Sequence, residues 1–511
     1  MRAPVAVAGV TRTRNADAQI AKDRVRWWVV FAVVMGFVLV TGAMAFRSAP
    51  DPFPLALAVL VLASVAAFLR PTIGVYLIVF LTLIGDGVTT AWWPFAKNLS
   101  SRESILFVHD ALAINPLEIL LVVTIAAWLL RYLEDPVWVF WRGRLFVPVM
   151  VFTAFVVIGL MRGVAAGGDR RIAIFEARPL LYIPLVYILV TNLLVTRAQY
   201  RRLMLMAFVA ISIQSIFALV YYQGLPAEER QALETLSEHS ATIHMNAVIV
   251  FLLAAYLLKC SLRTRVFATV LIIPVIYAYF LSQRRAAMIA LFIGIVVLVG
   301  VLFHRRRRAF WFFVPVAAFI GIGYLAATWN AIGPLGLPSQ AVKTVLFPDQ
   351  LGDADRSSDL YRQTEAFNLW FTIRQNEIAG VGFGRKFLQP VKLPDISFFE
   401  FWEYLPHNSI LWVWLKTGVL GMIAMFFMFG RAIQAGARSA LTVRTAEQAA
   451  IVVAALAYAV MFLVFAYVDI AWGSRSTVFL AVAFAVCGDF VPAIDSRPNG
   501  TARVREFVMP A

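Results

Sequence analysis

Cysteine, histidine and acidic residues are scarce in this sequence. Its 511 residues include 2 cysteines, 5 histidines and 29 acidic residues. Cys260 and Cys487 fall within or beside different apolar segments, which excludes a disulfide framework. No group of histidine, cysteine and aspartate has the spacing of metal ligands. We therefore expect packing roles for the two cysteines, no bound metal and no cofactor.

Apolar residues, in contrast, are abundant. They make up 61% of the chain, and the mean hydropathy is +0.80. In a soluble domain the apolar fraction is only roughly half. A bilayer core about 30 Å thick needs ~20 mostly apolar residues per helix. About fourteen runs, with a range of about 11–14, meet this requirement. They lie near 27–46, 53–69, 71–90, 114–130, 145–161, 179–195, 203–222, 244–261, 266–282, 286–303, 309–328, 408–430, 447–468 and 476–492.

The basic residues mark the loops between these runs. The net charge is +16, from 45 basic and 29 acidic residues. Basic clusters recur on alternate sides of the expected helices, as cytoplasmic loops require, so both termini are predicted to be cytoplasmic. No soluble domain exists to carry a basic groove for nucleic acid. The first apolar run follows about 26 polar residues, which predicts an uncleaved anchor and not a signal peptide.

These patterns predict an all-α, polytopic transmembrane helical bundle with one large extracytoplasmic loop. The expected division is a cytoplasmic tail, about eleven transmembrane helices, the loop with surface helices, the last three transmembrane helices and a second cytoplasmic tail. Their ranges are 1–26, 27–328, 329–406, 407–492 and 493–511.

Within the loop, residues 360–377 have helical spacing and predict an amphipathic helix on the membrane surface. Gly380, Gly382 and Gly384 end it. These glycines superficially resemble a nucleotide-binding loop, but they follow a helix and not a strand. Nucleotide binding is therefore disfavoured.

Several arginines are exceptions to the excess of basic residues in cytoplasmic loops, because they fall in the predicted outer segments. Arg178, Arg284, Arg285 and Arg362 are among them. Arg178 precedes Pro179, so it is expected at the outer N-terminus of the helix 179–195, an end that attracts anions. Arginine suits phosphate through its planar fork of donors. The alternatives are an interfacial arginine that reaches lipid headgroups and, for Arg284 and Arg285, a purely topological role.

A histidine opens the run 408–430. On a continuous helix, His407, Leu411, Trp414, Gly418 and Gly421 fall on one stripe. The positive end of a helix dipole disfavours imidazolium, so a neutral His407 can accept a proton. Gly418 and Gly421 are expected only to permit close helix packing. Alternatively, His407 is a cap or a satisfied interface residue.

These residues resemble a known family. His407-Asn408, nine intervening residues, Gly418, two more and Gly421 are similar to the pattern of bacterial O-antigen ligases and related O-antigen polymerases. The stretch from Arg362 to Trp370, followed by the glycines at 380–384, resembles the family's lead-in to that histidine. The resemblance spans about 170–430.

Two further arginines of the family resemble Arg178, before an apolar helix, and Arg285, before Ala286-Ala287. The family usually reads Ser-Arg-Gly at the second site, whereas this chain reads Arg284-Arg285-Ala286. We align Arg285 with the family residue and keep Arg284 as the alternative.

The resemblance implies a GT-C-like glycosyltransferase of the bacterial inner (plasma) membrane. It would move a glycan from undecaprenyl diphosphate to a glycan or lipid acceptor, among membrane lipids and on the outer face. In this reading Arg178 and Arg285, with Arg284 or Arg362, bind the diphosphate in place of a metal ion, and His407 removes the acceptor proton.

Other functions stay open. An O-antigen or exopolysaccharide polymerase would share these residues. A transporter or flippase of lipid-linked glycan would place charges along a path through the bundle, whereas here they cluster on one side. Asp86 and Glu118 could mark an ion path, but neither has a paired base nearby in the sequence.

Overall fold

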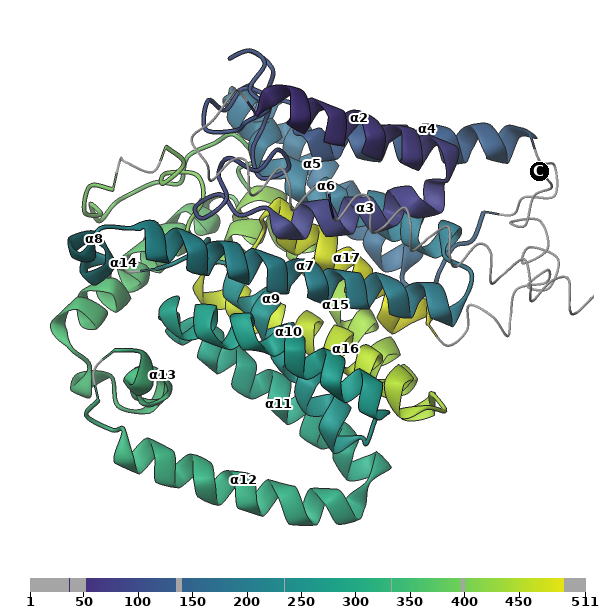
Figure 1. Ribbon diagram of the computed structural model, residues 1–511. Helices are drawn as coiled ribbons and strands as arrows, with labels where there is room; N and C mark the ends of the chain where they lie inside the picture. The colour runs from purple at the N-terminus through teal and green to yellow at the C-terminus, as the bar shows by residue number, and fades with distance from the viewer. Residues whose placement is uncertain are drawn as a thin grey trace, which may run out of the picture.

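The computed structural model (Figure 1) describes residues 52–134, 140–233, 235–331, 333–396 and 400–490, together with Gly36. In these ranges the secondary structure is helical, without strands. The apolar helices are α2 (Phe53–Leu69), α3 (Pro71–Ile84), α4 (Pro116–Glu134), α5 (Phe146–Ala165), α6 (Arg170–Leu193), α7 (Arg197–Gly224), α9 (Ala241–Leu257), α10 (Leu262–Leu281), α11 (Arg285–Arg305), α12 (Arg307–Ala327), α15 (Ser409–Thr442), α16 (Ala446–Val468) and α17 (Ser474–Asp489). The others are α8 (Ala227–Ala232), α13 (Leu337–Leu346), α14 (Asp353–Gln375) and the 3-10 helices η1 (Pro334–Gly336) and η2 (Pro348–Gln350).

The polytopic helical bundle predicted from the sequence is confirmed. Among the described residues, 9 helices are long and apolar enough to cross a membrane, and α2, α3 and α9 are shorter apolar helices. Every predicted run from 53–69 onward coincides with a helix. The first run, 27–46, lies outside the described residues except for Gly36, and so do the tails 1–26 and 493–511.

Several predicted helix boundaries are wrong: α15, for example, continues to Thr442 beyond the predicted end at 430. At two others, an aspartate side chain that binds backbone N–H groups explains the difference. Helix α3 ends at Ile84 and does not reach 90, because Asp86 Oδ1 accepts from the backbone N–H groups of Val88 and Thr89 at 3.0 Å. Helix α6 begins at Arg170, where Asp169 accepts from the N–H of Ile172. Pro179 therefore lies inside α6, and Arg178 does not stand at its N-terminus.

The long helices lie side by side around α16. This helix packs against α9, α11, α15 and α17, and most of its side chains are buried. At the other margin, α12 contacts α11 and has no buried residue, and it stands apart from the bundle in Figure 1. Helices α8, α13 and α14 gather at one end of the bundle, at the left of Figure 1.

Helix α15 is broken at Gly418, so the continuous stripe predicted from His407 to Gly421 is wrong. Gly418 has φ 76° and ψ 177°, a conformation that favours glycine. A Cβ there would lie 2.1 Å from the carbonyl oxygen of Ile378. Gly418 thus accommodates a neighbouring chain segment and does not serve helix packing. Gly421 does face another helix, since its Cβ would lie 3.3 Å from Phe155 Cβ of α5.

The neighbouring segment comprises residues 377–385, here called the glycine segment. It hydrogen-bonds to the broken turn of α15, because Val381 N donates to Leu415 O at 2.7 Å and Val419 N donates to Glu377 O at 3.0 Å. Gly380, Gly382 and Gly384 all have positive φ. A backbone that enters an apolar bundle must have its polar groups satisfied by protein, and these bonds do so.

A buried ion pair fixes the glycine segment to two helices. Lys416 Nζ lies 2.8 Å from Glu176 Oε1, and both side chains are 0% exposed. Lys416 also donates to the carbonyl of Arg385, and Glu176 accepts from the N–H of Gly384, both at 2.6 Å. These hydrogen bonds satisfy the buried charges. The pair therefore holds α6, α15 and the glycine segment together.

Candidate active site

His407 lies where α14 meets the start of α15. Its neighbour Asn408 is the N-cap of α15 and accepts from the N–H of Leu411 at 2.9 Å. His407 itself precedes the helix, and its side chain is 21% exposed. The cap fixes the backbone while the imidazole stays accessible.

Glu365 of α14 orients His407. Its carboxylate accepts from the His407 backbone N–H at 2.8 Å and lies 3.3 Å from Nδ1 of the ring. The Glu365 side chain is only 2% exposed. A carboxylate facing Nδ1 favours the tautomer that has its proton there, so Nε2 bears the lone pair. This is the chemical arrangement that a general base requires.

Two aromatic rings border His407. The ring of His239 lies 5.9 Å away and that of Tyr361 lies 5.6 Å away, centroid to centroid. Burial, and then the nearby Glu365, raise the pKa of the Tyr361 hydroxyl. We call His407, Glu365, Tyr361, His239, Asp469 and Arg284 the histidine cluster.

Asp469 and Arg284 lie behind His239. Asp469 Oδ1 is 2.6 Å from His239 Nδ1, while Arg284 Nη1 is 3.2 Å from the same nitrogen and 3.5 Å from Asp469 Oδ2. A carboxylate only accepts, so with Asp469 ionised the Nδ1 proton of His239 is directed to Asp469. Arg284, which only donates, then pairs with the carboxylate and not with this nitrogen. Burial opposes ionisation of Asp469, but His239 and Arg284 outweigh it and lower the pKa of the Asp469 carboxyl.

Arg285 and Arg362 lie on a separate set of partners. Arg285 donates to Thr344 Oγ1 at 2.8 Å and pairs with Asp355 and Asp359 at 3.4 and 3.3 Å. Arg362 pairs with Asp359 at 3.5 Å. Asp359 precedes Glu365 by six residues on α14, so their Cα atoms are ~9 Å apart along the helix axis. The structure therefore brings both arginines to the same end of the bundle as His407.

Arg178 is held elsewhere at this end. It lies 3.1 Å from Glu118, and it donates to Asn98 at 3.0 Å and to the carbonyl of Ala113 at 2.6 Å. These partners connect α6 with α4 and with the segment between α3 and α4. No contact among the described residues joins Arg178 directly to His407.

Three members of the histidine cluster, Glu365, Tyr361 and His239, were not predicted. His239 lies between the predicted runs 203–222 and 244–261, and Asp469 lies between the runs 447–468 and 476–492. The only sequence signal that these residues lie near His407 was their predicted location on the same side of the membrane. In the part of the chain that the structure describes, no group of three or more His, Cys, Asp or Glu residues could hold a metal ion.

Two comparisons with known proteins bear on this arrangement. Residues 267–426 match the family model described as O-Antigen ligase. The O-antigen ligase of Salmonella typhimurium (strain LT2) is 28% identical to this chain over 207 residues, which cover 39% of this chain and 48% of that protein. The chain thus spans about half the length of that relative. The matched residues include Arg284, Arg285, Arg362, Glu365 and His407. His239, Asp469 and Arg178 lie outside them.

Proposed function

We propose that this multi-pass membrane protein is a glycosyltransferase of cell-surface polysaccharide biosynthesis. The proposal is supported by the match of residues 267–426 to the O-Antigen ligase family model and by the 28% identity to the Salmonella typhimurium O-antigen ligase. The donor of this enzyme would be a glycan on undecaprenyl diphosphate, and its acceptor a hydroxyl group of a lipid or glycan. The reaction would take place on the outer face of the bacterial inner membrane, with both termini in the cytoplasm.

The chemistry needs a base and a cationic site. The acceptor oxygen attacks the anomeric carbon, the bond from that carbon to the diphosphate oxygen breaks, and the acceptor proton must leave. The diphosphate departs with the electron pair of the broken bond and gains one negative charge, which fixed cations stabilise. Arginines can do this without a metal ion, and we propose a metal-independent reaction.

One observation carries the proposal: His407 Nδ1 faces the buried carboxylate of Glu365, and Arg362 lies three residues before Glu365 on α14. In this orientation Nε2 of His407 takes the acceptor proton. Glu365 then stabilises the imidazolium, as a buried carboxylate does in hydrolytic triads.

The arginines at the start of α11 divide the diphosphate between them. We assign the phosphate next to the transferred sugar to Arg284, because its Nη1 lies 3.2 Å from the ring of His239, which borders His407. Arg285 and Arg362, which share Asp359, take the outer phosphate. When the donor binds, these arginines therefore exchange their carboxylate partners for phosphate oxygens. Arg178, with three partners of its own, has a supporting role in this scheme.

The test is glycan transfer by purified His407→Ala protein from an undecaprenyl-diphosphate donor in detergent, with and without a metal chelator. We expect wild-type turnover to survive chelation and the variant to lose about 10²–10⁴-fold. Translocation has no meaning in detergent, so turnover also separates an enzyme from a transporter.

The matched control is His109→Ala, which removes an exposed histidine between α3 and α4 and should leave turnover unchanged. Full activity of His407→Ala protein, or loss of wild-type activity on chelation, would contradict the proposal.

A further inference from the structure

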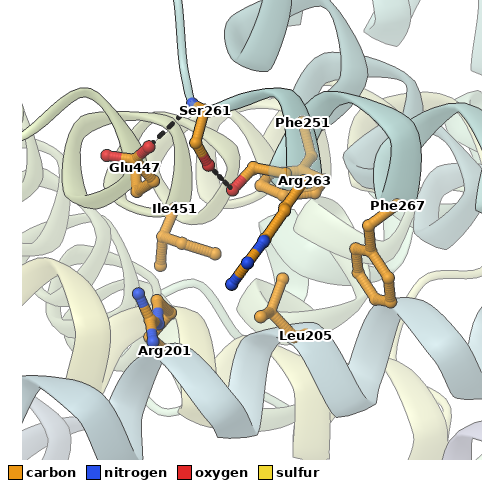
Figure 2. A pocket seen from close by; sticks show the side chains of 9 residues that line it. Arg201, Leu205, Phe251, Ser261, Arg263, Phe267, Glu447 and Ile451 are labelled. Atoms are coloured by element: carbon orange, nitrogen blue, oxygen red, sulfur yellow. Dashed lines mark hydrogen bonds between the residues drawn. The ribbon is translucent and has the colours of Figure 1, made fainter.

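A cavity of about 450 Å³ lies between the ends of α7, α10 and α16. Its lining includes two cations, Arg201 of α7 and Arg263 of α10, and the apolar side chains Leu205, Phe251, Phe267 and Ile451. Figure 2 shows the guanidinium groups of Arg201 and Arg263 directed toward the same part of the cavity. The combination of a cationic rim and an apolar wall suits an amphiphilic anion.

The cavity is at the opposite end of the bundle from the histidine cluster. Helix α16 leaves the cavity at Glu447 and ends beside Asp469, which contacts His239. Helix α10 leaves it at Arg263 and ends shortly before Arg284. Both helices therefore cross the bundle between the two sites, so a ligand here cannot be the substrate at His407.

The cavity has one carboxylate, and that group is engaged. Glu447 Oε1 accepts from the backbone N–H of Ser261 at 2.8 Å (Figure 2). The two arginines are exposed and exceed this single negative charge by one. An anion that enters the cavity therefore meets a net positive site and does not have to displace an existing ion pair.

The position of the cavity identifies the source of the anion. Spanning helices begin at Arg197, Leu262 and Ala446, so the cavity lies where the chain passes from headgroup to hydrocarbon. Basic pockets between transmembrane helices at this level bind lipid headgroups, and an arginine fork matches phosphate. A free phosphate ion would leave the apolar wall without a partner.

We propose that this cavity binds an anionic phospholipid of the membrane. Arg201 and Arg263 hold the phosphate, and an acyl chain lies against Leu205, Phe251, Phe267 and Ile451. The bound lipid links α7, α10 and α16 and so stabilises the bundle from the end remote from the histidine cluster. This site is independent of the proposed transferase chemistry.

The experiment uses the full chain in detergent with added phosphatidylglycerol, phosphatidylethanolamine or inorganic phosphate. Lipid binding is counted by native mass spectrometry, and the thermal midpoint is followed in parallel. We expect phosphatidylglycerol to bind and to raise the midpoint by several degrees. The double variant Arg201→Gln, Arg263→Gln should bind it about tenfold more weakly or worse, with a lipid-free midpoint like that of the wild type.

The matched control is Arg308→Gln, which removes an exposed arginine at the start of α12, at the same end of the bundle but outside the cavity. It should bind phosphatidylglycerol as the wild type does. Equal weakening by Arg308→Gln, or equal stabilisation by inorganic phosphate or phosphatidylethanolamine, overturns the proposal.

A measurement on the wild type covers the case in which the double variant does not fold. A photoactivatable phosphatidylglycerol should label peptides that contain 201–205, 261–267 or 447–451. Labelling confined to other peptides overturns the proposal.

Discussion

At the scale of single residues, Glu365 contacts both the backbone N–H and the ring of His407. The contact with the ring makes a prediction that the contact with the backbone alone would not. Glu365→Gln keeps an oxygen for the His407 N–H, which lies 2.8 Å from the carboxylate, but removes the charge that stabilises an imidazolium. We expect kcat to fall by about tenfold or more, with an unchanged KM for the donor. Steady-state kinetics in detergent measure both parameters.

The control for this variant is Glu377→Gln, since Glu377 is exposed just beyond the end of α14. It should leave kcat unchanged. A Glu365→Gln protein with unaltered kcat, or with only a raised KM, would show that Glu365 does not act through His407.

Asp469 predicts a pH dependence of stability. Its pKa is lowered in the folded protein, so its contribution is present above the ordinary value of about 3.9 and is lost as the pH falls below it. We expect Asp469→Asn to lower stability at pH 7 by about 3 kcal/mol, because a buried pair with Arg284 and His239 is broken. The difference from the wild type should narrow below about pH 4.

Thermal unfolding at pH 7 and pH 3 measures this difference. Asp110→Asn is the control, because Asp110 pairs with Arg102 in the exposed segment between α3 and α4 and should leave the midpoint unchanged at either pH. An Asp469→Asn midpoint equal to that of the wild type at pH 7 would contradict the prediction.

The sequence could point to His407 but not to its partners. His407 stands beside a capping asparagine and an apolar run, and both are local signals. Glu365 lies 42 residues earlier, and only the packing of α14 against α15 decides which face of α14 the histidine meets. His239 and Asp469 are separated by 230 residues, a distance over which hydropathy and spacing carry no information about contact.

At the scale of secondary structure, the break in α15 makes the third prediction. Gly418→Ala must place a Cβ 2.1 Å from the carbonyl oxygen of Ile378 at φ 76°. The backbone conformation alone, φ 76° with ψ 177°, costs an L-residue on the order of 1–3 kcal/mol, and the contact adds to it. We expect the thermal midpoint to fall by several degrees.

Gly430→Ala in the same helix is the matched control. Nothing lies within 4 Å of a Cβ at that position, and alanine is favoured in a helix interior by roughly 0.5–1 kcal/mol. Its midpoint should be unchanged or raised. Equal midpoints for the two variants would mean that α15 tolerates a side chain at its break.

Hydropathy predicted the helices well because a bilayer leaves few alternatives to them. It failed at α6, where the cap Asp169 lies upstream of the apolar run and Pro179 suggested a later start. Hydropathy also could not predict that the glycine segment packs against the break in α15. The positions of Gly380 and Gly418 follow from how closely two backbones approach, which depends on the buried pair of Lys416 with Glu176.

At the scale of the whole molecule, the two ends of the bundle carry different chemistry. The histidine cluster lies at the end of the bundle where α8, α13 and α14 gather. The arginines of the proposed lipid cavity lie at the other end. A donor on the outer face requires the first end to lie outside and the second in the cytoplasm, as the positive-inside rule predicts for arginine clusters. The orientation of the bundle is therefore a consequence of the proposed chemistry that can be measured without a substrate.

Single cysteines test this orientation, and the chain suits the experiment because Cys260 and Cys487 are both buried. Glu228→Cys lies on α8 at the first end, and Arg444→Cys lies between α15 and α16 at the second, both at exposed positions. In intact spheroplasts, a membrane-impermeant maleimide should label Glu228→Cys and should label Arg444→Cys only after permeabilisation. The reverse pattern would place His407 in the cytoplasm, where a lipid-linked donor on the outer face cannot reach it, and would refute the proposed reaction.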